Sequence, residues 1–285
     1  MKKNTSMILS TVLGLSLMGC SSSANSTNPD SKTLKVAIVK QLDHASLDEI
    51  ADAIASELDA ISEKEGITIE YGEIYSGQND QSTLKQIGDT VMNDGVDCII
   101  PIATLAAQTM VVSRGDNTTP IVFAAISDPE TADLTGLDNM TGTSDALNTK
   151  QILDMMKAQK PDIKKVGLLY SKSEANSEKP IADAKEYLDS LGISYVEATA
   201  NTNDEVIAAA NTLVSDKVDA VFTPTDNVIM AAEISVAEIF ADAKIPHYTG
   251  ADSFVKNGAF VTCVLTIQNL ASRQQILRMK LCRKV

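Results

Sequence analysis

Short aliphatic runs alternate with longer amphipathic stretches through most of this 285-residue chain. The runs suit buried strands, and the stretches between them repeat their apolar residues with a helical period. Such alternation predicts an α/β protein with parallel sheets covered by helices on both faces. We expect strands at Leu34–Val39, Thr68–Tyr71, Cys98–Ile102, Ile121–Ala125, Val166–Tyr170, Ser194–Ala198, Ala220–Thr223 and Pro246–Thr249. We expect helices at Leu47–Glu65, Gln81–Asn93, Thr149–Gln159, Glu178–Leu191, Asn203–Val214 and Asn227–Ala243.

Glycine and proline mark the ends of these elements. Gly66, Gly95 and Gly192 follow helical stretches, where a left-handed residue commonly ends a helix. Pro161 and Pro246 lie in the short links that lead into the next strand. The positions of these glycines and prolines therefore support the predicted boundaries of the helices and strands.

Two segments of the chain resemble each other. Residues 94–101 read Asp-Gly-Val-Asp-Cys-Ile-Ile-Pro, and residues 216–223 read Asp-Lys-Val-Asp-Ala-Val-Phe-Thr. Each segment runs from the end of a helix through a Val-Asp pair into an aliphatic strand, and a polar turn follows the strand. We therefore expect two Rossmann-like lobes joined by a hinge, spanning residues 34–143 and 144–263. Ligands of open α/β sheets bind beyond the carboxyl ends of the strands, so facing lobes would share one cleft.

The N-terminus has the pattern of an export signal. Lys2 and Lys3 precede an apolar run from Met7 to Met18, which is too short to span a bilayer. Leu17-Met18-Gly19-Cys20 resembles a bacterial lipobox, so we expect a signal peptide at 1–19 and acylation of Cys20, with palmitate among its chains. Residues 20–33 are rich in Ser, Asn and Thr and would form a flexible spacer. The alternative is an ordinary signal peptide with an incidental cysteine.

Composition excludes several kinds of function. The formal net charge of −14 opposes binding to nucleic acid and a polybasic grip on anionic lipid. With only His44 and His247, and no paired-cysteine motif, we expect no metal site, no cofactor and no disulfide framework. Cys98 lies in an apolar run and is expected to be an inert core thiol. We find no nucleophile elbow, dinucleotide fingerprint, P-loop or zinc-protease motif, so an enzyme is not expected.

Polar residues gather where the predicted strands end. Helix N-termini suit a carboxylate, and strand-end carboxylates suit an ammonium group, so together they could hold both ends of an amino acid. Taken singly, each of these residues is better explained as a helix cap. The candidate ligand-binding residues are Thr104, Gln108, Ser127, Asp128, Glu174, Asn176, Ser177, Thr225, Asp226, Asn227 and Asp252.

At these positions the chain resembles a known family. It is similar to substrate-binding lipoproteins of ABC importers with the type I periplasmic-binding fold, in the group associated with tryptophan and related aromatic amino acids. The matching stretches are Tyr75–Ser82, Ile102–Gln108, Pro120–Pro129, Gly167–Tyr170, Ser173–Ser177, Pro224–Asn227 and Gly258–Thr262. The family usually has a His-Pro pair near the first strand, where this chain has His44-Ala45. Leu42 and His44 remain candidates for packing against an apolar ligand side chain, although His44 could equally lie in a surface loop.

The C-terminus departs from the family more strongly. The family continues after Cys263 with a helix and a final strand, whereas Val264–Val285 is basic and contains no Asp or Glu. A shifted reading frame from Val264 permits Pro-Asp-Tyr-Thr-Glu-Leu-Gly and further residues that restore the family pattern. We therefore hypothesise a truncated, frameshifted tail in which the last helix and strand are missing or altered. The alternative is a naturally divergent C-terminus, and DNA sequencing distinguishes the two.

The resemblance implies a monomeric, non-enzymatic binding protein on the extracytoplasmic face of a cell membrane, either at the cell surface or in a periplasm. It would be anchored by lipid on Cys20 and would deliver a small solute, expected to be an aromatic amino acid, to an ABC permease. A ligand-sensing lipoprotein that signals to a membrane receptor would share this fold. An exported hydrolase is a further alternative, although the sequence offers no nucleophile–base pairing.

Overall fold

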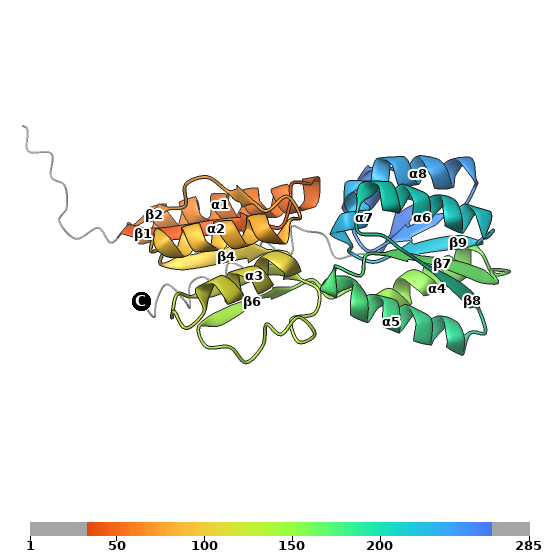
Figure 1. Cartoon of the computed structure of the whole chain (residues 1–285), viewed down its shortest axis with the longest axis horizontal. Coiled ribbons are helices and arrows are strands. Elements are labelled where there is room, and N and C mark those ends of the chain that lie inside the picture. The colour runs from red at the N-terminus through yellow and green to blue at the C-terminus, as the bar shows by residue number, and fades with distance from the viewer. Residues whose placement is uncertain (1–32, 264–285) are drawn as a thin grey trace, which may run out of the picture. The chain divides into compact units, whose positions relative to one another are not determined.

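The computed structural model describes residues 33–263, which form two α/β lobes (Figure 1). The predicted signal peptide, Cys20, nearly all of the spacer and the basic tail lie outside the described residues. The elements of the N-terminal lobe are β1 (Thr33–Lys40), α1 (Ala45–Glu65), β2 (Thr68–Glu70), β3 (Tyr75–Ser76), α2 (Gln81–Asn93), β4 (Cys98–Ile102), α3 (Thr104–Arg114), β5 (Ile121–Ile126) and β6 (Met140–Ser144). Those of the C-terminal lobe are α4 (Thr149–Gln159), β7 (Lys165–Tyr170), α5 (Ala175–Ser190), β8 (Ser194–Thr199), α6 (Asn203–Ser215), β9 (Ala220–Thr223), α7 (Asn227–Ala231), α8 (Glu233–Asp242), β10 (His247–Thr249), α9 (Asp252–Lys256) and β11 (Val261–Thr262).

Each lobe contains one parallel sheet. The first sheet has the order β2-β1-β4-β5-β6, with β3 paired to the far end of β1. The second has the order β11-β10-β9-β7-β8. Parallel strands need long crossovers, and the helices between the strands provide them. The predicted fold class of two parallel-sheet lobes is therefore confirmed.

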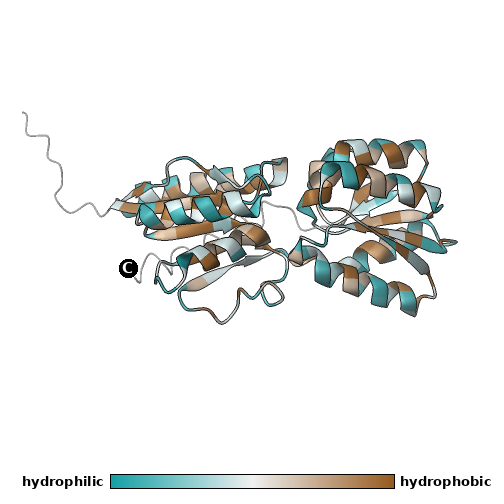
Figure 2. Ribbon diagram, in the orientation of Figure 1, coloured by the Kyte–Doolittle hydropathy of each residue, from teal (hydrophilic) through white to brown (hydrophobic). Residues whose placement is uncertain are grey.

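Alternation along each strand divides the core into two layers. In β1, Val36 and Ile38 pack with α1, whereas Ala37 and Val39 pack on the opposite face with α2 and α3. In the C-terminal lobe, Leu168 packs with α4 and α5, and its neighbour Leu169 packs with α6, α7 and α8. Buried strands are accordingly apolar on both faces, while the helices keep polar residues outward (Figure 2).

The repeated Val-Asp pair has the same role in both lobes. Asp97 accepts a hydrogen bond from the backbone N–H of Lys35 at 2.8 Å, at the start of β1. Asp219 accepts from the N–H groups of Lys164 and Lys165 at 2.8 and 2.9 Å, at the start of β7. Each aspartate satisfies donors at the beginning of the neighbouring strand, so the sequence repeat is a structural repeat.

The predicted elements are largely found, with identifiable errors. The helix predicted over Asn227–Ala243 is interrupted at Ala232 and forms α7 and α8. Strands β3 and β11 are only two residues long, and β6 reads Met-Thr-Gly-Thr-Ser, which has too little apolar character to signal a strand. Cys98 begins β4 and is only partly buried, so its prediction as a core thiol was too strong. The three glycines that end helices do have positive φ, as predicted.

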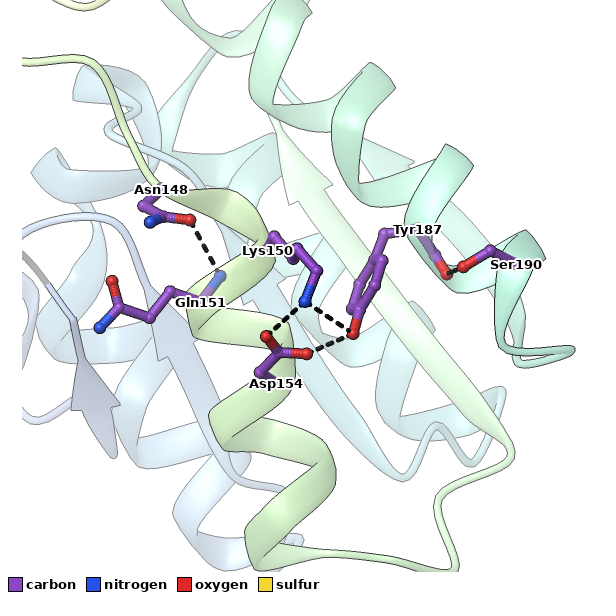
Figure 3. A network of polar contacts seen from close by, with 6 residues as sticks. All are labelled: Asn148, Lys150, Gln151, Asp154, Tyr187 and Ser190. Carbon is purple, nitrogen blue, oxygen red and sulfur yellow. Dashed lines mark hydrogen bonds and ion pairs between the residues drawn. The ribbon is translucent and has the colours of Figure 1, made fainter.

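Helices α4 and α5 are joined by a surface network (Figure 3). The Lys150 ammonium donates to Asp154 at 2.7 Å and lies 4.6 Å from the centre of the Tyr187 ring, and the Tyr187 hydroxyl donates to Asp154. At the start of α4, the Asn148 side chain accepts from the Gln151 N–H at 3.1 Å. This cap fixes the position of the α4 N-terminus, which reaches the cavity described below.

Candidate ligand-binding site

A cavity of about 710 Å³ lies where strands end and helices begin in both lobes. Its N-terminal-lobe wall comes from the starts of α1 and α3 and from the residues that follow β5 and β6. Its C-terminal-lobe wall comes from the starts of α4, α5, α7 and α9. This is the position at which open parallel sheets bind ligands.

The cavity is lined by acidic side chains. Asp145, Asp226 and Asp252 line it, and the described lining residues include neither Lys nor Arg. A positively charged group is therefore favoured inside it, and a ligand carboxylate would need neutral hydrogen-bond donors.

Asp145 is the carboxylate with the most freedom to bind a ligand. It follows β6 and accepts a hydrogen bond from the Ser127 hydroxyl at 3.1 Å. Desolvation by burial raises the pKa of Asp145, and the hydrogen bond from Ser127 opposes that shift. The Ser127 hydroxyl also lies 3.0 Å from the Thr225 hydroxyl of the other lobe. An ammonium group beside Asp145 would offset the desolvation of its carboxylate.

Asp226, in contrast, is occupied by the protein itself. It is fully buried and accepts from the N–H of Ser171 at 2.6 Å, the hydroxyl of Ser177 at 2.7 Å and the N–H of Ile229 at 3.0 Å. Burial raises the pKa of Asp226, although these donors act in the opposite direction. Its main role is to cap α7 and to fix the loop that follows β7.

A buried hydrogen-bond chain links the two lobes beside the cavity. Gln41 accepts from the N–H of Leu105 at 3.1 Å, so its amide nitrogen faces Glu174 and donates to that carboxylate at 2.5 Å. Glu174 also accepts from the Asn227 amide nitrogen at 2.7 Å. Burial, followed by the charge of Asp226, raises the pKa of Glu174 to about 7.

The chain ends at His44, which lines the cavity. The Asn227 amide nitrogen donates to Glu174, so its oxygen faces His44 Nε2 at 3.1 Å. His44 must therefore carry its proton on Nε2 and donate to Asn227. Desolvation by burial lowers the pKa of His44, which favours the neutral ring.

Two alanines at the cavity have unusual backbone conformations. Ala103 directly follows β4 and has φ of 73°. Ala125 lies near the end of β5 with φ of 54°, at an irregularity in the pairing of β5 with β6. Positive φ is costly for a residue with a Cβ and is found most often at functional sites. Ala103 immediately precedes α3, so the positive end of that helix dipole lies at the cavity.

Part of the remaining wall is apolar. Leu47 and Ile50 of α1, Leu147 before α4, Met230 of α7 and Phe254 of α9 line it. A ligand that carries both a charged end and an apolar body matches this division.

The predicted binding residues are divided between the cavity wall and its supports. Leu42 packs in the core beside α1, and Gln108 donates to the carbonyl of Ala132 at 3.2 Å. Asp128 accepts from the N–H groups of the turn that follows it, while Ser177 and Glu174 hold Asp226 and Asn227 from behind. The predicted residues that line the cavity are His44, Thr104, Ser127, Asn176, Thr225, Asp226, Asn227 and Asp252.

Sequence reasoning missed Asp145 and the apolar wall. Asp145 follows β6, a strand that the sequence did not signal, so the rule of polar residues at strand ends could not reach it. Leu47 and Ile50 were absorbed into the apolar face of a predicted helix. No group of His, Cys, Asp and Glu side chains within residues 33–263 has the arrangement of a metal site.

The two parallel-sheet lobes and the cavity between strand ends define a solute-binding protein of the periplasmic-binding type. The chain belongs to the ABC transporter substrate binding protein family, whose family model matches residues 35–273. This is a family of solute-binding proteins rather than of enzymes.

Individual relatives agree with this assignment. The chain is 31% identical over 282 residues to a tyrosine-binding protein from Clostridioides difficile (strain R20291), covering 94% of this chain and 81% of the relative. It is also similar to the structure of an ABC domain in complex with L-Trp from Streptococcus pneumonia, with 26% identity, a TM-score of 0.81 and coverage of 89% and 86% of the two chains. The ligand-free, open structure of a substrate-binding protein with adhesive properties from Clostridium difficile gives 27% identity, a TM-score of 0.61 and coverage of 88% and 85%.

Proposed function

We propose that this protein captures an aromatic amino acid in the cavity and delivers it to the permease of an ABC importer. The observation that carries the proposal is the division of the cavity between the Asp145 carboxylate, with neither Lys nor Arg among the described lining residues, and an apolar wall. An α-ammonium group would pair with Asp145. The α-carboxylate would lie toward the start of α3, and the side chain would contact Leu47 and Phe254.

The comparisons support this choice of ligand class. One relative is named for tyrosine, and one similar structure contains L-Trp. In this proposal the lobes close on the ligand by a hinge motion. Within this proposal the lobes correspond to residues 34–143 and 144–263.

Membrane attachment forms a second part of the proposal. The described residues contain no helix long and apolar enough to cross a bilayer. Acylation of Cys20 would hold the protein on the extracytoplasmic face beside its permease. Expression of a Cys20→Ser variant tests this, since the variant should leave the membrane fraction and the parent should remain there.

Ligand binding is tested by a thermal-shift screen of the 20 amino acids with sugars and short peptides as comparison. A ligand present at 100 times its dissociation constant stabilises the folded state by about 2.7 kcal/mol. We expect the largest shifts with tyrosine and tryptophan, confirmed by calorimetric titration. If sugars or peptides raise the melting temperature and no amino acid does, the proposed ligand class is wrong.

A further inference from the structure

Three polar atoms of cavity-lining residues have no hydrogen-bond partner. They are Nδ1 of His44 and the hydroxyl oxygens of Ser46 and Ser253, and all three atoms are buried. The serines are themselves 8% and 2% exposed. A buried polar atom without a partner destabilises the folded protein, so three of them on residues that line one cavity point to a polar group of a ligand.

These residues come from neighbouring helix starts in the two lobes. Ser46 is the second residue of α1, and Ser253 is the second residue of α9. The Lys256 ammonium at the end of α9 lies 3.6 Å from the Glu49 carboxylate of α1, so the two helices are neighbours. The apolar residues Leu47 and Phe254 follow the two serines directly and also line the cavity. This part of the wall therefore combines an apolar surface with unpaired polar atoms.

The hydrogen-bond chain described above defines what His44 can bind. Because Nε2 carries the proton and donates to Asn227, Nδ1 presents a lone pair. The ligand group beside it must therefore be a donor. The serine hydroxyls can either donate or accept.

We propose that His44, Ser46 and Ser253 bind a phenolic hydroxyl, so that the site selects tyrosine over phenylalanine. This inference rests on the proposed function and specifies its ligand. A phenol has one proton to donate and lone pairs to accept, so it can donate to His44 and accept from the serines. An indole N–H can only donate and leaves the serines without a partner. Phenylalanine satisfies none of the three atoms.

The test compares the affinities of tyrosine, phenylalanine and tryptophan by calorimetric titration of the full chain. Parent protein should bind tyrosine at least about tenfold more tightly than phenylalanine, since a site that hydrogen-bonds a hydroxyl rejects the analogue that lacks it. Ser46→Ala, Ser253→Ala and the double variant should lower this ratio stepwise toward one, with little change for phenylalanine. His44→Phe removes the acceptor for the phenol proton and should lower the ratio as well. Any weakening of lobe closure in this variant affects both ligands equally and leaves the ratio unchanged.

Ser113→Ala is the matched control. The Ser113 hydroxyl is also buried and unpaired, but it packs near Gly88 of α2 and does not line the cavity. This variant should keep the parental ratio. Equal affinity of the parent for tyrosine and phenylalanine would overturn the inference and leave the proposed function standing, as would a ratio unchanged in all three cavity variants. If none of the three amino acids binds, the proposed function fails and this inference fails with it.

Discussion

Replacement of Asp145 by Asn separates the ligand-binding role of this carboxylate from its effect on folding. Its carboxylate is desolvated and accepts a hydrogen bond from Ser127. A hydrogen bond between charged partners contributes roughly 1.5–3 kcal/mol. At about 1.4 kcal/mol for each factor of ten, the variant should bind its amino acid roughly 10- to 150-fold more weakly.

The same substitution should stabilise the ligand-free protein. The folded-state pKa of Asp145 is raised above its unfolded value, so the ionised group disfavours folding at any pH above that raised pKa. Asparagine keeps the shape and removes the charge. The melting temperature without ligand should therefore increase while the affinity decreases, as is common when a binding residue is replaced.

Calorimetric titration with tyrosine and tryptophan, together with thermal unfolding of the ligand-free protein, measures both effects. Asp189→Asn provides the control, because it makes the same change in net charge at an exposed position on α5. The control should leave the affinity unchanged. A dissociation constant for Asp145→Asn within about twofold of the parent would refute the assignment of the ammonium site.

Three further predictions concern the supports of the cavity. The raised pKa of Glu174, about 7 in the folded state against 4.5 for the free group, should make the parent more stable as pH falls from 8 to 5, by up to roughly 3 kcal/mol. Glu174→Gln should reduce this slope in pH-dependent thermal melts, and an unchanged slope would assign it to the other buried carboxylates, Asp145 and Asp226. Gly250→Ala would place a Cβ 2.7 Å from the backbone nitrogen of Thr225. The free energy of unfolding measured in urea should fall by about 1–3 kcal/mol, and the ligand affinity measured by titration should weaken. Unchanged values would show that the loop moves aside without cost. Gln41→Leu removes a hydrogen-bond partner from both the Leu105 N–H and the Glu174 carboxylate. The free energy of unfolding in the same assay should fall by about 2–4 kcal/mol, whereas a decrease below about 1 kcal/mol would argue against the buried hydrogen-bond chain.

Much of the fold could be read from the sequence because its signals are local. The strands β4 and β9 and the helices α2 and α4 have the predicted bounds. Each strand is a short apolar run, and each helix repeats its apolar residues with a helical period between clear ends. Strand β6 escaped detection because its residues are only partly buried at the edge of the first sheet, so they carry little apolar pattern. The helix is also split at Ala232, where the sequence has neither glycine nor proline to signal a break.

The site was predicted only in part, and the reason is that a polar residue at a strand end can cap, support or bind. The sequence by itself determined that the chain forms parallel α/β lobes and that polar residues collect at the strand ends. Only the tertiary structure decided that the oxygens of Asp226 are taken by Ser171, Ser177 and Ile229, whereas Asp145 has Ser127 beside it and faces the cavity. The donors that hydrogen-bond to a carboxylate oxygen come from segments distant in the chain, so no local sequence pattern predicts them.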